Sequence, residues 1–318
     1  MSIGIPYVFG LFLLISLLCS LLACSGEPES LRIGGNRWPG YGPVYLADDL
    51  GWLQSQGIQL LEYPHATGVL RAFDNNLLDA ALLTLDEALQ LAARGHDLEI
   101  LLITNISAGA DVLYARPGIG RLQELAGQRI GVEAGALGGH LLARTLELAG
   151  LAERDVQVVS LPIHEHAEAL GAGRIDAAIS FATEEPAFLA AGARRLLDTR
   201  ALPDTVIDVL VVERGRISAQ RREQLRALWF DSLREWHDNH EQADARLVRR
   251  LGIDQETLHL TVDGLQLGDR ALNRRLLDDG RLAERLDSLH AFMRSHGLLA
   301  RAIDTGSLLP APCRSAQC

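Results

Sequence analysis

The feature that most constrains the fold of this 318-residue chain is an internal repeat with a spacing of 97 residues. The segment "RIGG" at Arg32 returns as "RIGV" at Arg129. At the same spacing, "LDAALLT" returns as "IDAAISF", and "DVLYAR" returns as "DVLVVE". Three matches in one order and at one spacing indicate two copies of a single folding unit.

Each copy alternates short apolar runs with helical patterns, in the order strand, helix, strand, helix, strand. The expected strands are residues 31–35, 58–63, 79–84, 129–133, 156–161 and 176–181. The helical patterns between them are residues 44–53, 68–77, 140–151 and 164–173. This alternation predicts an α/β fold of two lobes, each with a mostly parallel, doubly wound sheet. Residues 217 to about 300 have a helical pattern almost throughout, and no third sheet is expected.

A ligand site in such a fold lies beyond the carboxyl ends of the parallel strands, where loops lead into helix N-termini. That rule gathers the loops at residues 36–43, 64–68, 84–88, 133–139, 162–166 and 181–186. If the two lobes face each other, these loops line one cleft. Residues 111–116 and 208–213 end the two copies, and we expect them to be hinge strands.

The residues of these loops that we expect to contact a ligand are Asn36, Trp38, Tyr41, Thr67, Gly68, Thr84, Asp86, Glu133, Gly135, Thr183 and Glu184. Trp38 and Tyr41 would stack on a flat or apolar ligand surface. Their alternative role is packing at the edge of the first lobe, and alanine substitutions would separate the two by their effect on binding or on stability. The hydroxyls of Thr67 and Thr84 also suit helix caps.

The charge of the expected cleft indicates the kind of ligand. The carboxylates in its loops are Asp86, Glu87, Glu133, Glu165, Glu184 and Glu185, and its one base is Arg37. The helix macrodipole by itself favours acids in a first turn, which accounts for part of this excess. A site for an anion would present arginines or bare helix N-termini. We therefore expect a small ligand that is neutral and polar or cationic, such as a heteroaromatic amine.

Several other functions are disfavoured by composition. The net charge is -11 and the chain has no lysine, so neither a nucleic-acid surface nor a lysine Schiff base is expected. His164 and His166 flank Glu165, but two histidines two residues apart on a helix point in different directions, and no metal or cofactor is expected. Gly135, Gly138 and Gly139 would let backbone N–H groups approach a ligand.

The first residues resemble a bacterial lipoprotein signal. An uncharged, leucine-rich run ends at Ala23-Cys24, which predicts a signal peptide over residues 1–23, lipidation of Cys24 and a polar tether to residue 30. An uncleaved membrane anchor is the alternative. Either way the chain is exported, and in a Gram-negative cell Ser25 favours the outer membrane. Cys313 and Cys318 in the tail form a disulfide or remain free.

The ordered segments "WPGYGPVYLADDLG", "DAALLTLDEAL", "GADVLYARP", "LAGQRIGVEAGALG" and "FATEEPAF" resemble the type II solute-binding proteins of ABC importers. The resemblance is to the branch that includes binders of nitrate, taurine, aliphatic sulfonates and thiamine pyrimidine precursors. It implies a receptor with one lobe at residues 31–112 and 208–300, a second lobe at 116–207 and a tail at 301–318. Its partners would be a small molecule, the membrane and a permease with its ATPase.

Two other functions remain alternatives at this stage. A protein with the same cleft can pass its ligand signal to a membrane sensor kinase or cyclase. Enzymes with the same two-lobed fold exist. The pyrimidine-precursor synthases that this chain resembles hold pyridoxal phosphate on a lysine, and this chain has no lysine. We therefore expect a binding protein and not an enzyme.

Overall fold

The computed structural model describes residues 30–133, 135 and 137–310, which form two separate β-sheets. The first sheet has the strand order β11-β4-β10-β3-β1-β2. Its strands are β1 (Leu31–Asn36), β2 (Ile58–Tyr63), β3 (Ala80–Thr84), β4 (Leu98–Ser107), β10 (Ile207–Glu213) and β11 (Leu265–Leu267). β1 pairs in parallel with β2 and β3, whereas β10 lies antiparallel between β3 and β4. The short strand β11, in the region expected to be helical, extends this sheet.

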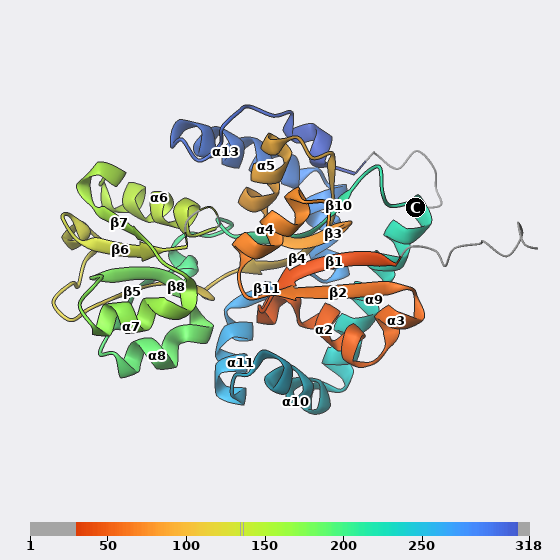
Figure 1. Cartoon of the computed structure of the whole chain (residues 1–318), viewed down its shortest axis with the longest axis horizontal. Helices are drawn as coiled ribbons and strands as arrows, with labels where there is room; N and C mark the ends of the chain where they lie inside the picture. The colour runs from red at the N-terminus through yellow and green to blue at the C-terminus, as the bar shows by residue number, and fades with distance from the viewer. Residues whose placement is uncertain (1–29, 134, 136, 311–318) are drawn as a thin grey trace, which may run out of the picture.

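The second sheet has the order β7-β6-β8-β5-β9. Its strands are β5 (Asp111–Ala115), β6 (Arg129–Val132), β7 (Gln157–Ser160), β8 (Ala177–Phe181) and β9 (Arg194–Asp198). β6 is parallel to β7 and β8, and β5 is antiparallel to β8 and β9. The predicted two-lobed α/β fold is therefore confirmed (Figure 1). Each lobe is built on parallel β-α-β units, and one antiparallel strand is inserted into each sheet.

The two antiparallel strands inside the sheets, β5 and β10, are the segments expected to be hinges. Each is the first strand after the chain crosses from one sheet to the other, through residues 108–110 and 199–206. β5 lies wholly in the second sheet, so the second lobe begins at Asp111 and the first lobe does not extend to residue 112. The chain changes lobes in these crossovers, and the strands beside them are integral parts of the sheets.

Helices cover both faces of the first sheet. The helices α2 (Gly42–Asp49), α3 (Trp52–Ser55), α9 (Ala219–Asp238), α10 (His240–Leu251) and α11 (Gln255–Asp263) pack on one face around a core that includes Tyr45 and Trp229. The other face carries α4 (Ala66–Asp74), α5 (Leu85–Arg94), α12 (Arg270–Asn273) and α13 (Arg281–Ser295), packed around Phe73 and Met293. The C-terminal third of the chain thus completes the first lobe (Figure 1).

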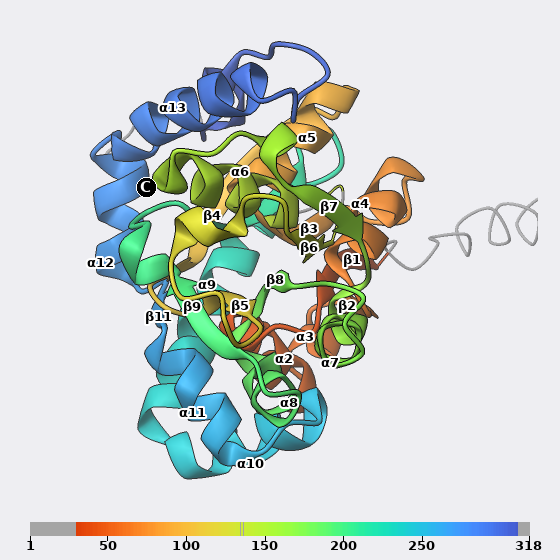
Figure 2. The same cartoon turned by 90° about the vertical axis from the view of Figure 1, so that its left-hand side faces the viewer.

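The second sheet has its own two layers. α6 (Leu137–Ala149) packs on one face, and α7 (His166–Gly171) and α8 (Glu185–Ala190) pack on the other, where Tyr114 stacks on Phe188 with ring centroids 4.1 Å apart. Figure 2 shows this lobe in front of the first. Each lobe therefore has a core of its own.

One part of the repeat stabilises the lobes rather than the ligand site. Arg32 at the start of β1 binds Asp79 through two side-chain N–H groups at 3.0 and 2.9 Å, and its backbone N–H donates to the same carboxylate at 2.9 Å. Arg129 and Asp176 repeat all three hydrogen bonds in the second lobe, each at 2.9 Å. Arg129 is the main reason that the pKa of Asp176 is lowered to about 2. In each copy this Arg–Asp pair connects the start of the first strand with the start of the third.

The ends of the chain correspond only in part to the sequence expectations. Residues 301–310, expected to be tail, pack on the first lobe, where Leu308 is buried and Arg214 donates to the carbonyl of Ser307 at 2.6 Å. The signal peptide, Cys24, most of the tether, Cys313 and Cys318 lie outside the described residues. No helix among the described residues is long and apolar enough to cross a membrane.

Candidate ligand-binding cleft

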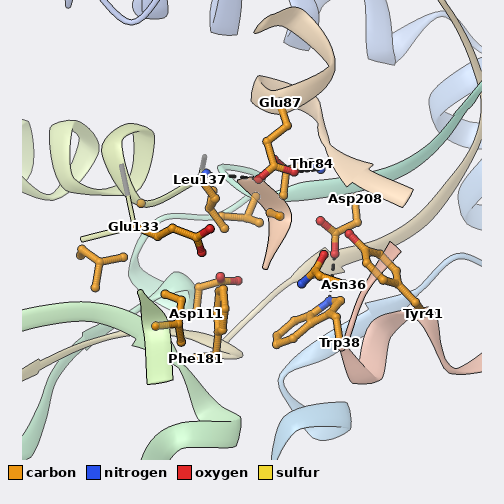
Figure 3. A pocket seen from close by; sticks show the side chains of 15 residues that line it. Asn36, Trp38, Tyr41, Thr84, Glu87, Asp111, Glu133, Leu137, Phe181 and Asp208 are labelled. Atoms are coloured by element: carbon orange, nitrogen blue, oxygen red, sulfur yellow. Dashed lines mark hydrogen bonds between the residues drawn. The ribbon is translucent and has the colours of Figure 1, made fainter. Parts of the chain in front are cut away.

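A pocket lies between the two lobes, at the edge where the parallel strands of both sheets end (Figure 3). The first lobe contributes Asn36, Trp38, Tyr41, Ala66, Thr84, Glu87 and Asp208, and the second contributes Asp111, Glu133, Leu137, Gly138, Ile163, Ile179 and Phe181, with Val206 from a crossover. The cavity volume is about 40 Å³. The lobes therefore stand close together around a small enclosed space.

The lining of the pocket follows the internal repeat. Five of its residues in the first copy have their counterparts, 97 positions later, on the opposite wall. The pairs are Asn36 with Glu133, Tyr41 with Gly138, Ala66 with Ile163, Thr84 with Phe181, and Asp111 with Asp208. Equivalent positions of the two copies thus face one another, as expected if the duplication created the cleft.

Aromatic side chains form one part of the wall. The Trp38 ring lies 5.2 Å from that of Phe181 in the other lobe, centroid to centroid. Trp38 and Tyr41 are only 6% and 3% exposed and belong to the core of the first lobe. Gly40, between them, allows this packing, because a Cβ there would lie 2.5 Å from the Trp38 ring nitrogen. Both rings are therefore part of the core of the first lobe and also line the pocket.

Four carboxylates face the pocket, two from each lobe. Glu87 and Asp208 belong to the first lobe and Asp111 and Glu133 to the second, and each is at most 8% exposed. Burial, reinforced by the charge of Asp86, raises the pKa of Glu87 to about 8. Burial also raises the pKa of Asp111 to about 7. The pKa of Asp208 is raised well above its ordinary value by burial and by the charge of Asp111.

The two glutamates hold the lobes together at helix N-termini. Glu133 of the second lobe accepts hydrogen bonds from the hydroxyl and backbone N–H of Thr67, in the first turn of α4, at 2.9 and 3.3 Å. Glu87 of the first lobe accepts one from the N–H of Leu137, the first residue of α6, at 3.4 Å (Figure 3). Each lobe thus presents a carboxylate to the positive end of a helix in the other.

Of the residues expected from sequence, Asn36, Trp38, Tyr41, Thr84 and Glu133 line the pocket. The others lie around it. Thr67 reaches it only through Glu133, Gly68 packs against Tyr63, and Asp86 is buried behind it with its Oδ1 accepting from Thr84 at 2.7 Å. Gly135 is exposed, and Thr183 and Glu184 lie half-buried in a short turn.

The remaining residues of interest have structural contacts. Glu185 accepts hydrogen bonds from the Tyr114 hydroxyl at 2.9 Å and from Nε of Arg195 at 3.0 Å. His166 is buried, with its Nε2 3.0 Å from the carbonyl of Leu161, and His164 stacks on His65 across the lobes. Within the described part of the chain, no cluster of three or more His, Cys, Asp or Glu residues is placed to hold a metal ion.

Sequence reasoning missed Asp111 and Asp208 because the strand-end rule was applied only to parallel strands. β5 and β10 run antiparallel to their neighbours, so their amino ends lie at the cleft edge. Asp111 is paired with Phe181, the last residue of β8, and Asp208 with Thr84, the last residue of β3. The signal was present, since both aspartates open a repeated segment.

Comparison with known proteins shows which family and which solved structures this chain is similar to. The family described as NMT1/THI5 like matches residues 38–233. The alkanesulfonate-binding protein SsuA of Xanthomonas axonopodis pv. citri, bound to MOPS, is 18% identical, with 90% of this chain and 99% of that chain covered and a TM-score of 0.74. The periplasmic aliphatic sulphonate-binding protein SsuA of Escherichia coli is 19% identical, with 92% and 96% covered and a TM-score of 0.72.

An enzyme also has this fold. The desulfurization enzyme DszB is 20% identical, with 90% of this chain and 97% of that chain covered and a TM-score of 0.63. No curated protein matches the sequence significantly. At these identities the structural likenesses establish the fold, whereas the family match spans more than half of the chain. The chain belongs to the NMT1/THI5-like family and has the two-lobed fold of the periplasmic binding proteins.

Proposed function

We propose that this protein is the solute-binding component of an ABC importer and captures a small, polar, neutral or cationic organic molecule between its lobes. The observation that carries the proposal is the pocket, which is lined by matching residues of two lobes that each have a core of their own. A ligand that fills it contacts both lobes and stabilises the closed arrangement, which a permease can recognise. The SsuA proteins that share this fold are described as binding alkanesulfonates or aliphatic sulphonates.

The charge of the pocket supports a neutral or cationic ligand over a sulfonate. Its described lining contains four carboxylates and no arginine or histidine. Arg37, the base expected in the cleft, is exposed and does not line the pocket. A sulfonate placed among buried carboxylates would lose its hydration without gaining a cationic partner.

The lack of common nucleophiles favours binding over catalysis. The chain has no lysine, and it has no cysteine between residues 25 and 312, so neither of these nucleophiles is present in the cleft. We further propose that the protein is exported and lipid-anchored through Cys24, which is supported by the pattern of residues 8–24. The receptor would then work outside the cytoplasm and deliver its solute to a membrane permease.

Isothermal titration calorimetry tests the proposal, with the small molecules that co-purify with the protein first identified by native mass spectrometry. We expect a neutral or cationic solute to bind with micromolar or tighter affinity, and taurine and hexanesulfonate to give no heat of binding. Tight binding of a sulfonate would overturn the ligand class. Turnover of the bound solute, or no solute bound at all, would overturn the binding function.

A further inference from the structure

The two glutamates and the two aspartates of the cleft differ in their hydrogen-bond partners. Glu87 and Glu133 already accept hydrogen bonds from backbone N–H groups of the opposite lobe. Asp208 accepts one from the indole N–H of Trp38 at 3.0 Å. Asp111 is 1% exposed, yet among the described residues its Oδ2 has no hydrogen-bond partner. A buried, unpartnered carboxylate oxygen facing a cavity indicates that a donor from outside the protein completes the site.

We propose that Asp111 and Asp208 are the specificity-determining pair of the cleft, which together bind the positively charged group of an organic cation, an amine or amidinium, and make closure depend on that charge. The inference rests on the proposed function and narrows its ligand class. The pair stands at equivalent positions of the two copies, one in each lobe (Figure 3). A single cation between the lobes can therefore contact both.

The neighbouring groups support a cation in this position. Glu87, Glu133 and the buried Asp86 add further carboxyl groups, and the phenol of Tyr41 and the indole of Trp38 lie beside Asp208. The imidazole of His140, on α6, has its Nδ1 3.7 Å from Asp86 and does not line the pocket. The faces of Trp38 and Phe181 suit a flat or alkylated cation, since aromatic rings attract positive charge.

The same geometry explains how charge controls closure. Bringing the lobes together removes two carboxylates of each lobe from water and places them around one cavity. In this arrangement burial, and after it the charges of neighbouring carboxylates, raises the pKa values of Glu87, Asp111 and Asp208. Without a ligand, ionised carboxylates around the cavity therefore oppose closure unless they take up protons. A bound cation removes that opposition, whereas a neutral molecule of the same shape does not.

Hydrogen–deuterium exchange of the full-length protein in detergent tests this without knowledge of the ligand. The N–H groups of Thr67 and Leu137 bond across the lobes, so their protection reports closure. In the ligand-free protein we expect protection, corrected for intrinsic exchange, to rise at least threefold as the pH falls from 8 to 6. Asp111→Asn and Asp208→Asn should show that protection already at pH 8. Asp263→Asn, which removes the same charge from an exposed position, should behave as wild type.

Calorimetry supplies the second arm, with benzamidine, benzylamine and choline as cations and benzamide and benzyl alcohol as neutral counterparts. We expect at least one cation to bind tenfold or more tightly than any neutral probe, and both aspartate variants to lose at least tenfold of that affinity. Exchange unchanged in both variants, or cation affinity unaffected by them, would overturn the inference. Binding of a neutral or sulfonate probe alone would overturn it too, while leaving the solute-binding function intact.

Discussion

At the scale of single residues, Trp38 has the packing role that was one of its two expected alternatives, and it also lines the pocket. Its ring is buried in the core of the first lobe, and its indole N–H donates to Asp208 at the pocket. If Trp38 only contacted a ligand, its truncation would cost little stability. The burial of the ring argues against that expectation, since a truncated core residue leaves a cavity.

Two substitutions separate these roles. Trp38→Ala should lower the free energy of unfolding of the ligand-free protein by about 3–5 kcal/mol, the usual cost of removing a large buried side chain. Trp38→Phe keeps most of the packing against Phe181 but removes the donor to Asp208, and should cost about 1–2 kcal/mol. Urea denaturation followed by circular dichroism measures both. Equal stabilities for Trp38→Ala and wild type would show that the ring does not support the core.

At the scale of elements, the start of α6 is positioned by Gly138. A Cβ on Gly138 would lie 2.8 Å from the carbonyl oxygen of Glu133 and 3.0 Å from its nitrogen. The helix therefore begins in close contact with the end of β6, and this contact positions Glu133 against Thr67. The next residue, Gly139, has no such contact, since its nearest neighbour would be the Leu298 side chain at 3.6 Å.

These adjacent glycines make a matched pair of alanine variants. Gly138→Ala should destabilise the protein by about 1–3 kcal/mol through overpacking, and it should weaken ligand binding because Glu133 is displaced. Gly139→Ala should be stabilising by about 0.5–1 kcal/mol, since alanine is the better helix former. Thermal unfolding and calorimetric titration give both values. The close-contact explanation fails if the two variants behave alike.

At the scale of the whole molecule, the acidic cleft makes stability depend on pH. The pKa values of Glu87 and Asp111 are about 8 and 7 in the folded protein, well above those of unfolded carboxylates, and that of Asp208 is raised as well. A raised carboxylate pKa contributes stability below its unfolded value, and this contribution is lost as the pH rises through the folded value.

The melting temperature of the ligand-free protein should therefore fall as the pH rises from 5 to 8, by about 2 °C for each kcal/mol lost. Differential scanning calorimetry across this range measures the change, and Asp111→Asn should flatten it. Asp263→Asn, with the same change in net charge, should keep the slope of wild type. A melting temperature that rises between pH 5 and 8 would mean that these carboxylates do not control stability.

Much of this architecture follows from local sequence. The repeat and the alternation of strands and helices determine two α/β lobes, because the first three strands of each copy form a sheet whose apolar faces the helices between them must cover. Asn36, Thr84 and Glu133 were predictable as pocket residues because they end, or directly follow, parallel strands. The same reasoning indicated an acidic cleft, although it chose Asp86 where Glu87 lines the pocket.

Only the tertiary structure decided which carboxylates meet and in what surroundings. The insertion of β5 and β10 antiparallel into the two sheets turns their amino ends, and with them Asp111 and Asp208, toward the cleft. It also buries Trp38 while leaving Arg37 exposed. These outcomes depend on contacts between segments about a hundred residues apart, and a local pattern records which residues are apolar or charged but not which of them share a cavity.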